Sequence, residues 1–151
     1  MYYAKLDMDR DGTVNVTFPD VPEAITYGET LDEALAHARD ALETALECYE
    51  ESGTEFPLGK YRSKYPVHPR MLVAAKLELM RAMKAEGMTK YRLGKLLKMH
   101  PPQVDRLVSV KHKTRMDEVE RALAAVGRQV WAKFNVTPLK SATTKTGLRQ
   151  P

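Results

Sequence analysis

Side chains able to read and hold a nucleic acid gather between residues 100 and 115. Gln103 can both donate to and accept from the edge of adenine, and Arg106 can donate two hydrogen bonds to guanine. Four residues follow at which a loop could clamp phosphate groups: Lys111, His112, Lys113 and Thr114. These residue types at this spacing indicate a DNA-binding surface.

Two short helices must position these side chains. Thr89 is a favourable N-cap for a helix that ends near Lys98, and Pro101 suits the first turn of a second helix that runs to about Val110. The second helix would turn Val104, Leu107 and Val108 inward and Pro102, Gln103, Asp105, Arg106 and Ser109 toward solvent. Two short helices joined by a tight turn predict a helix-turn-helix.

Residues of both helices and of the following loop are expected at the DNA, with basic side chains of the first helix adding phosphate contacts. The expected DNA-binding residues are Thr89, Lys90, Tyr91, Pro102, Gln103, Arg106, Lys111, His112, Lys113 and Thr114. The alternative is a basic helical domain that is only solvated. Binding through several phosphates weakens steeply with added salt, so salt dependence separates the two.

The turn between the two helices departs from the usual pattern of such units, which carry a small Ala in the first helix and a Gly at the turn. Here Gly94 and Lys98 stand at those places. Gly94 still permits close helix packing. Lys98 must either adopt a left-handed conformation or alter the turn.

Carboxylates near the N-terminus invite a metal hypothesis. Asp7, Asp9, Asp11 and Gly12 copy the opening of a calcium-binding loop, but the position that must supply a bidentate Glu is Phe18. A nuclease would need further carboxylates converging on two metal ions, and no sequence signal places them. We therefore predict no metal site, no cofactor and no catalytic residue.

Strand and turn signals open the chain. The segments 2–8 and 13–18 are rich in Tyr, Val, Thr and Phe, and the Asp11-Gly12 step between them predicts a hairpin. A third strand is expected around 24–27. Thr30 and Glu33 have capping-box spacing, and an apolar stripe predicts a helix over 31–52.

Segments after this helix are less regular at first. Proline and glycine predict a linker near 60–69, with one short strand near 65–68, and periodic apolar residues predict helices over 71–86 and 116–126. Alternation over 130–136 predicts a strand, whose simplest partner is its own copy in a second subunit. The composition of 137–151 predicts a disordered tail.

Charge divides the chain in two. Residues 1–59 hold 14 acidic and 3 basic side chains, a net charge of −11, whereas residues 60–151 hold 6 acidic and 21 basic side chains, a net charge of +15. This division indicates one surface for a cationic partner and another for phosphates. The alternative for the acidic half is a solvated helix face.

Size and composition set further bounds. With 151 residues and a single cysteine, the chain can form one moderate core or two small ones but no internal disulfide. It has neither an apolar run long enough to span a bilayer nor an N-terminal signal peptide, so a cytoplasmic protein is expected.

Several N-terminal motifs resemble those of the HicB antitoxin family. They are the hairpin with Asp11-Gly12, Phe18-Pro19-Asp20-Val21-Pro22-Glu23-Ala24, Gly28-Glu29-Thr30, Glu33-Ala34-Leu35, Ala41-Leu42 and Phe56-Pro57-Leu58. Residues 70–136 resemble the C-terminal part of the form of this family that carries a helix-turn-helix. The resemblance covers nearly the whole chain up to residue 136.

The resemblance implies an α+β protein whose partial ribonuclease-H-like domain, an antiparallel sheet with one long helix, binds HicA, a small basic toxin that cleaves RNA. The helix-turn-helix domain, ending in a strand, would bind operator DNA and repress the operon. The charge division agrees with both partners. Phe18-Pro19-Asp20 and Gly28-Glu29-Thr30 are interpreted first as fold determinants. The strands, the helix face and the 18–27 loop all stay open as the toxin-facing surface, with Phe18, Asp20, Glu23, Tyr27 and Glu29 as candidate contacts.

The expected domains are therefore 1–59 for the toxin, 60–69 as linker, 70–136 for DNA and dimerisation, and 137–151 as tail. A homodimer or a dimer of dimers is expected, without enzymatic activity. The alternative function is a stand-alone transcriptional regulator whose N-terminal domain senses a small ligand.

Overall fold

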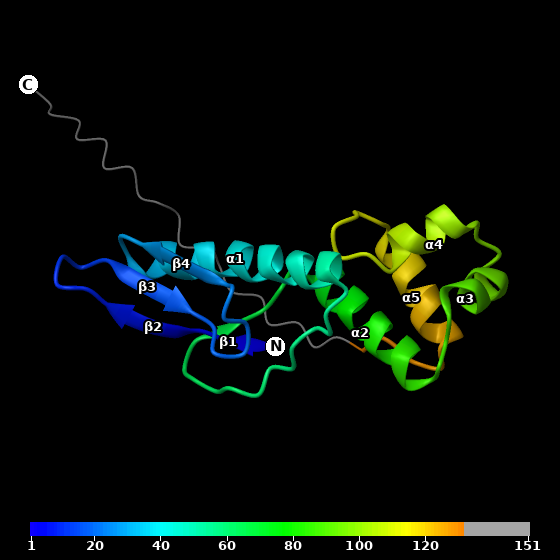
Figure 1. The fold of residues 1–151 in the computed structure, drawn as a ribbon, viewed down its shortest axis with the longest axis horizontal. Coiled ribbons are helices and arrows are strands. Elements are labelled where there is room, and N and C mark those ends of the chain that lie inside the picture. The colour runs from blue at the N-terminus through cyan, green and yellow to red at the C-terminus, as the bar shows by residue number, and fades with distance from the viewer. Residues whose placement is uncertain (132–151) are drawn as a thin grey trace, which may run out of the picture.

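The computed structural model describes residues 1–131, which form a mixed α+β protein with a three-stranded antiparallel sheet, a two-stranded antiparallel sheet and five helices. The elements in order are β1 (Tyr2–Tyr3), β2 (Lys5–Met8), β3 (Val14–Thr17), β4 (Ile25–Gly28), α1 (Leu31–Ser52), β5 (Pro66–Val67), α2 (Met71–Ala85), α3 (Lys90–Leu97), α4 (Pro101–Leu107) and α5 (Met116–Ala125). The sheet and α1 lie at one end of the molecule and α2–α5 at the other (Figure 1). None of the helices described combines the length and apolarity needed to cross a membrane.

The predicted hairpin is confirmed. β2 and β3 pair antiparallel with Leu6 opposite Val16, and Gly12 at the turn has a positive φ of 92°. β4 pairs antiparallel with the other side of β3, so the expected third strand is also confirmed. Val14 and Val16 face the core, which leaves the alternate positions on the outer face of the sheet.

Helix α1 lies across the inner face of the sheet and begins and ends where its sequence predicts. Thr30 Oγ1 accepts a hydrogen bond from the backbone N–H of Glu33 at 3.2 Å, and Glu33 Oε2 accepts one from the backbone N–H of Glu29 at 2.8 Å. Gly53 ends the helix in the left-handed conformation. The helix packs its small and aliphatic face, including Ala34, Ala38 and Leu42, on the strands.

Gly28 explains one of the N-terminal motifs. A Cβ atom at this position would lie 2.4 Å from the backbone nitrogen of Ala34, which is closer than any side chain tolerates. β4 can therefore approach the first turn of α1 only because residue 28 lacks a side chain. The motif Gly28-Glu29-Thr30 combines this close approach with the helix cap.

The segment expected as a linker, 60–69, is held against the N-terminal sheet. Its short strand, β5, pairs antiparallel with β1, and Ala4 N donates to Tyr65 O at 2.9 Å. Ser63 Oγ donates to Ala4 O at 2.6 Å, and Tyr61 N donates to Asp20 Oδ2 at 2.8 Å. The strand predicted near 65–68 is confirmed, and its partner is the N-terminus.

Two clusters of buried residues form the interior. The first gathers the sheet, α1 and β5, and the second gathers α2–α5. Helix α2 contributes to both, because Leu77 lies in the first cluster and Leu79 in the second. Val110, which follows α4, also lies in the first cluster. The two halves of the chain therefore share buried contacts.

Some expectations were wrong in detail. α4 ends at Leu107 rather than near Val110, and Ser109 is buried rather than turned toward solvent, because the chain after α4 folds back toward α1 and α2. Val130 and Trp131 are not in a strand. The rest of the predicted strand, 132–136, and the predicted tail lie outside the described residues.

Candidate functional site

Helices α3 and α4 are two short helices joined by a tight turn, and both begin where the sequence predicts. Thr89 caps α3, because its Oγ1 accepts a hydrogen bond from Arg92 N at 3.2 Å. Leu93, Gly94 and Leu97 are buried beneath it. The cap fixes where α3 begins, and its buried face packs against the cluster of buried residues formed by α2–α5.

Lys98 resolves the question of the turn. It adopts the left-handed conformation with φ 54° and ψ 43°, and it is the only non-glycine residue with positive φ among residues 1–131. Met99 N donates to Gly94 O at 2.9 Å across this turn. A Cβ at Gly94 would lie 3.1 Å from Val104 Cγ2, so the glycine lets α3 and α4 pack closely. The structure thus keeps a tight turn at the cost of an unfavourable backbone conformation at Lys98.

Helix α4 presents a polar face to solvent. Pro101 and Pro102 occupy its first turn, and Val104 and Leu107 are buried. Gln103 Oε1 accepts a hydrogen bond from His100 N at 2.9 Å, so part of its hydrogen-bonding capacity stabilises the start of the helix. Its amide nitrogen is a separate donor on an exposed side chain.

Four of the expected DNA-binding residues line one hollow. Gln103 and Arg106 from α4 and Lys113 and Thr114 from the following loop border a shallow surface cavity. The carboxylate-bearing side chain of Glu118 borders it as well. The Thr114 hydroxyl is buried and has no hydrogen-bond partner among the described residues. The arrangement offers basic and amide donors around one concave patch.

Other expected DNA-binding residues lie along α3. Lys90 and Tyr91 border a groove between α3 and α4, with Lys98 and His100 on its other parts. Tyr91 is 72% exposed, and Lys95 Nζ lies 5.4 Å from the centre of its ring. Lys90 Nζ pairs with Asp105 Oδ1 of α4 at 2.8 Å. Lys90, which lines this groove, directly follows the N-cap residue Thr89. The lysine side chains of the groove add positive charge beside α4.

Lys111 and His112 are exposed in the loop between α4 and α5, residues 108–115, which we call the α4–α5 loop. Lys111 points toward the N-terminal half, where its Nζ pairs with Glu51 of α1. The hydrogen bond to Glu51 raises the pKa of Lys111. Sequence reasoning missed this partner, because the two residues are 60 positions apart.

The residues expected at the toxin divide into buried and exposed positions. Phe18 is 1% exposed and belongs to the core, and Asp20 accepts its hydrogen bond from Tyr61 N. The idea that Phe18 contacts a toxin is therefore corrected: its ring fills the core beneath the sheet. Phe18 and Asp20 act as fold determinants, which was the first interpretation of their motif.

Glu23, Tyr27 and Glu29 are exposed around β4. Tyr27 is 64% exposed and pairs in register with Asn15 on the outer face of the sheet. Glu23 Oε2 accepts a hydrogen bond from Tyr49 Oη at 2.7 Å. This bond lowers the pKa of Glu23 and raises the pKa of Tyr49 to about 12. The outer face therefore carries the exposed ring of Tyr27, whereas the Glu23 carboxylate is bonded to α1.

Much of the acidity of α1 is directed at the basic half of the same chain. Arg70 forms an ion pair with Asp40 at 2.7 Å and another with Glu43. Glu50 Oε2 accepts a hydrogen bond from the backbone N–H of Val110 at 2.8 Å. Just beyond the helix, Glu55 pairs with Lys84 at 2.7 Å. Neither of the two readings of the acidic half foresaw these contacts, since composition does not tell which charges face one another.

The N-terminal aspartates shape the hairpin. Thr13 N donates to Asp11 Oδ1 at 3.0 Å, and Asn15 Nδ2 donates to Asp9 Oδ2 at 2.8 Å. Across residues 1–131, no three side chains of His, Cys, Asp or Glu are grouped closely enough to hold a metal ion.

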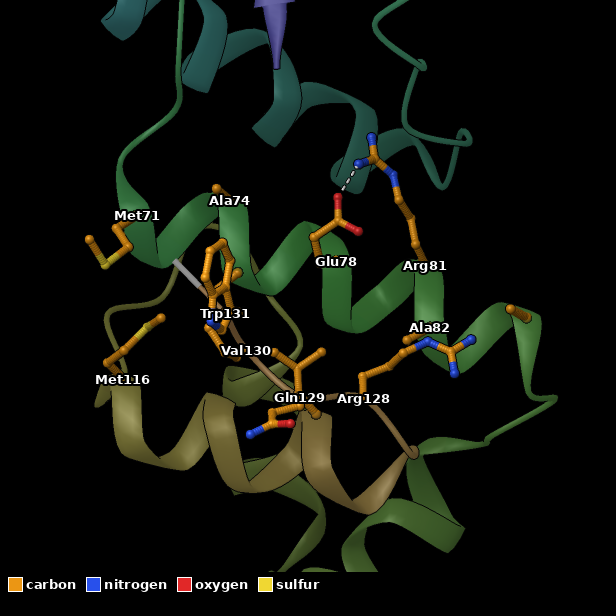
Figure 2. Close-up of a pocket in the computed structure, with 13 residues that line it drawn as sticks. Met71, Ala74, Glu78, Arg81, Ala82, Met116, Arg128, Gln129, Val130 and Trp131 are labelled. Carbon is orange, nitrogen blue, oxygen red and sulfur yellow. Dashed lines mark hydrogen bonds and ion pairs between the residues drawn. The ribbon is translucent and has the colours of Figure 1, made fainter. Parts of the chain in front are cut away.

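An apolar cavity of about 540 Å³ opens between α2 and α5 (Figure 2). Figure 2 shows Met71 and Ala74 on α2 and Met116 on α5 around the cavity, and Val130 and the largely exposed Trp131 also line it. An ion pair between Arg81 and Glu78, 2.6 Å long, lies at its rim. The cavity belongs to the helical half of the chain and gives no support to a ligand site in the N-terminal half.

Comparison with known proteins gives matches to one family. A family model described as "HicB_like antitoxin of bacterial toxin-antitoxin system" matches residues 1–78. The chain is 37% identical over 129 residues to "Antitoxin HicB 2" of Photorhabdus laumondii, covering 85% of this chain and 92% of the relative. It is 36% identical over 131 residues to "Antitoxin HicB" of Pseudomonas fluorescens, covering 85% and 90%.

A more distant relative, "Antitoxin HicB" of Escherichia coli K12, is 32% identical over 122 residues, covering 80% of this chain and 88% of the relative. These alignments extend beyond residues 1–78 and so include most of the helical half. The family match agrees with the resemblance that the N-terminal motifs carry. The chain therefore belongs to the HicB-like antitoxin family of bacterial toxin-antitoxin systems.

Proposed function

We propose that this chain neutralises a small basic RNA-cleaving toxin of the HicA type and binds operator DNA to repress its own operon. The toxin would be masked by the N-terminal sheet domain, and the DNA would be held by a helix-turn-helix made of α3 and α4. Both actions are steric and electrostatic, without catalysis by this chain. The observation that carries the DNA assignment is the exposed face of α4, where Gln103 and Arg106 adjoin Lys113 around one hollow.

The base-reading role is assigned to Gln103 and Arg106, because both side chains are exposed on the helix that would enter the major groove. Phosphate contacts are assigned to the lysines that flank this helix, Lys90, Lys111 and Lys113. Two of these lysines are already paired with carboxylates, Lys90 with Asp105 and Lys111 with Glu51. Their binding to phosphate would require exchange of partners.

The toxin-facing surface is assigned to the outer face of the sheet around Tyr27. This face carries Tyr27 and Ile25, 64% and 66% exposed, and the exposed Asp7 of β2, which lies in register with Asn15 and Tyr27. Glu23 and Glu29 flank β4 in the sequence. A large exposed aromatic ring within an acidic surround suits a cationic protein. The alternative acidic surface, the C-terminal part of α1, already pairs with Arg70 and Lys111.

A homodimer or a dimer of dimers stays part of the proposal, because two recognition helices would then meet two half-sites of an operator. A cytoplasmic location is proposed with it.

Reconstitution tests both activities separately. The chain is mixed with a HicA-type toxin, and RNA cleavage is followed against the molar ratio of the two proteins. Loss of cleavage at a fixed stoichiometry would support neutralisation, and undiminished cleavage at excess antitoxin would refute it. Binding to duplex DNA from upstream of its operon, titrated at several salt concentrations, tests the second activity. Operator binding that responds to small metabolites but not to toxin would favour the ligand-sensing regulator instead.

A further inference from the structure

Lys76 is a buried cation whose role the proposed function has not used. It lies in the middle of α2 and is 0% exposed. Its Nζ donates hydrogen bonds to the backbone carbonyl oxygens of Arg106 at 3.0 Å and Ser109 at 2.7 Å, and to that of His112. All three donors of an ammonium group are thus used by main-chain oxygens.

Because all three acceptors are main-chain carbonyl groups, the hydrogen bonds of Lys76 depend on the backbone conformation of the segment that carries them. Arg106 lies in the last turn of α4, where the backbone carbonyl oxygens carry the partial negative charge of the helix end. Ser109 and His112 lie in the α4–α5 loop. Burial lowers the pKa of Lys76, and a buried charge persists only where its hydrogen bonds are satisfied. The last turn of α4 and the α4–α5 loop must therefore keep one and two carbonyl groups, respectively, directed at the Lys76 ammonium group.

Glu50 holds the same loop from the opposite half of the molecule. Its Oε2 accepts a hydrogen bond from the backbone N–H of Val110 at 2.8 Å, and the Val110 side chain lies in the N-terminal core. Figure 1 shows the loop after α4 beside the C-terminal end of α1. The carbonyl of Ser109 is thus bound to α2 while the N–H of Val110 is bound to α1.

We propose that Lys76 and Glu50 are positioning residues for DNA binding, because together they hold the backbone of the α4–α5 loop that presents Lys111, His112 and Lys113. The inference rests on the proposed DNA-binding function and adds to it that the N-terminal helix α1 helps to shape the DNA-binding surface. Neither Lys76 nor Glu50 contacts DNA in this assignment. They act through the loop.

The experiment compares Lys76→Met, Glu50→Met and Glu50→Gln with the wild-type full-length chain. Lys76→Met keeps a long unbranched side chain but removes the three donors. Glu50→Gln keeps an oxygen acceptor for Val110 N–H, whereas Glu50→Met removes it. Binding to upstream operon duplex and to a random duplex is titrated at three salt concentrations, and amide hydrogen exchange is followed by peptide.

Lys76→Met and Glu50→Met are expected to weaken binding to both duplexes about tenfold and to reduce the salt slope by about two, the effect of losing two phosphate contacts. Amides of 106–113 should exchange faster while those of β2, β3 and β4 stay unchanged. Glu50→Gln should stay within about twofold of wild type, since its carbonyl still meets Val110 N–H.

Folded Lys76→Met and Glu50→Met variants with wild-type affinity and salt slope would overturn the inference. If Lys76→Met does not fold, the Glu50→Met and Glu50→Gln pair decides: a difference between them supports the inference, and equal wild-type binding overturns it. A wild-type chain without salt-dependent DNA binding would refute the proposed DNA-binding function and this inference with it. If instead the wild-type chain binds DNA and the variants bind equally well, only the inference about Lys76 and Glu50 fails.

Discussion

Glu51 and Lys111, 60 residues apart, form an ion pair that joins the end of α1 to the α4–α5 loop. Their side chains are 59% and 38% exposed, so the pair lies at the surface. A DNA phosphate that binds Lys111 must compete with this carboxylate. The acidic and basic halves of the chain thus meet at a residue proposed to hold DNA.

Glu51→Gln is expected to strengthen binding to any duplex about two- to fivefold, because an exposed ion pair of this kind stabilises by about 0.2–1 kcal/mol. The measurement is a DNA titration by fluorescence anisotropy at low and moderate salt. Glu55→Gln, which removes the partner of Lys84, is the control and should leave DNA binding unchanged. Weaker binding of Glu51→Gln would show that the pair supports the loop instead.

Lys111→Ala should weaken binding to operator and random DNA about equally and lower the salt slope by about one, as expected for one phosphate contact. In the Lys111→Ala background the effect of Glu51→Gln should disappear, because both changes act on one pair. A double-mutant cycle of the four proteins measures this. Additive effects of the two substitutions would contradict competition at Lys111.

Arg106→Ala should reduce discrimination between operator and random DNA by about 1–3 kcal/mol, because its guanidinium is assigned to a base edge. Lys113 borders the same hollow as Arg106, so Lys113→Ala is the matched comparison. It should reduce the affinity for operator and random DNA equally, because Lys113 is assigned to a phosphate. Affinities for the two duplexes at one salt concentration give the discrimination. Equal losses for Arg106→Ala would remove its assignment to base reading.

Tyr27→Ala should weaken toxin binding by about 1–2 kcal/mol, since large exposed aromatic residues at the centre of an interface contribute most of its affinity. Tyr91→Ala removes a comparably exposed ring from α3 and should leave toxin binding unchanged while weakening DNA binding. Calorimetric titration of toxin and anisotropy with DNA complete the crossed comparison. Unaltered toxin affinity in Tyr27→Ala would move the toxin interface away from the outer sheet face.

Tyr49→Phe should raise the pKa of Glu23 toward its ordinary value, because the Tyr49 hydroxyl lowers it by hydrogen bonding. A lowered carboxyl pKa stabilises the fold above the unfolded value of about 4.3 and loses that effect as the pH falls through the folded pKa. Tyr49, with its pKa raised to about 12, contributes below about pH 10 and loses its effect as the pH rises through the folded value.

The melting temperature of Tyr49→Phe should therefore lie below that of wild type at pH 7, and the gap should narrow as the solution is acidified below about pH 4. Carboxyl NMR titration of Glu23 together with thermal melts at several pH values checks both statements. Tyr91→Phe, at an exposed tyrosine on α3, is the control. An unchanged Glu23 titration in Tyr49→Phe would contradict the assignment.

Local signals predicted most elements of the fold. Asp11-Gly12, the caps at Thr30 and Thr89 and the stop at Gly53 act within a few residues, so their positions follow from the sequence. The end of α4 was misplaced because the last turn depends on a distant residue: Lys76 binds the carbonyl groups that follow.

For the candidate site, the sequence identified side-chain chemistry better than side-chain partners. Exposure of Gln103 and Arg106 follows from the helical period and the buried Val104 and Leu107. The sequence indicated a role of Phe18 in the fold but did not predict that its side chain is buried. The motif around Phe18 has no helical or strand periodicity from which core and surface positions could be told apart. Partners such as Glu50 for Val110 could not be predicted, since no local pattern joins residues 60 positions apart.

The sequence by itself determined the family, the hairpin, the helices with their caps and the opposite charges of the two halves, because each depends on residue type and short-range spacing. Only the tertiary structure decided that these charges pair with each other across the molecule, that 60–69 packs on the N-terminus, and that Lys76 and Glu50 grip one loop from two sides. The contacts that only the tertiary structure decided are long-range contacts. They form when hydrophobic faces of separate elements pack against one another, and no local segment of the sequence determines that packing.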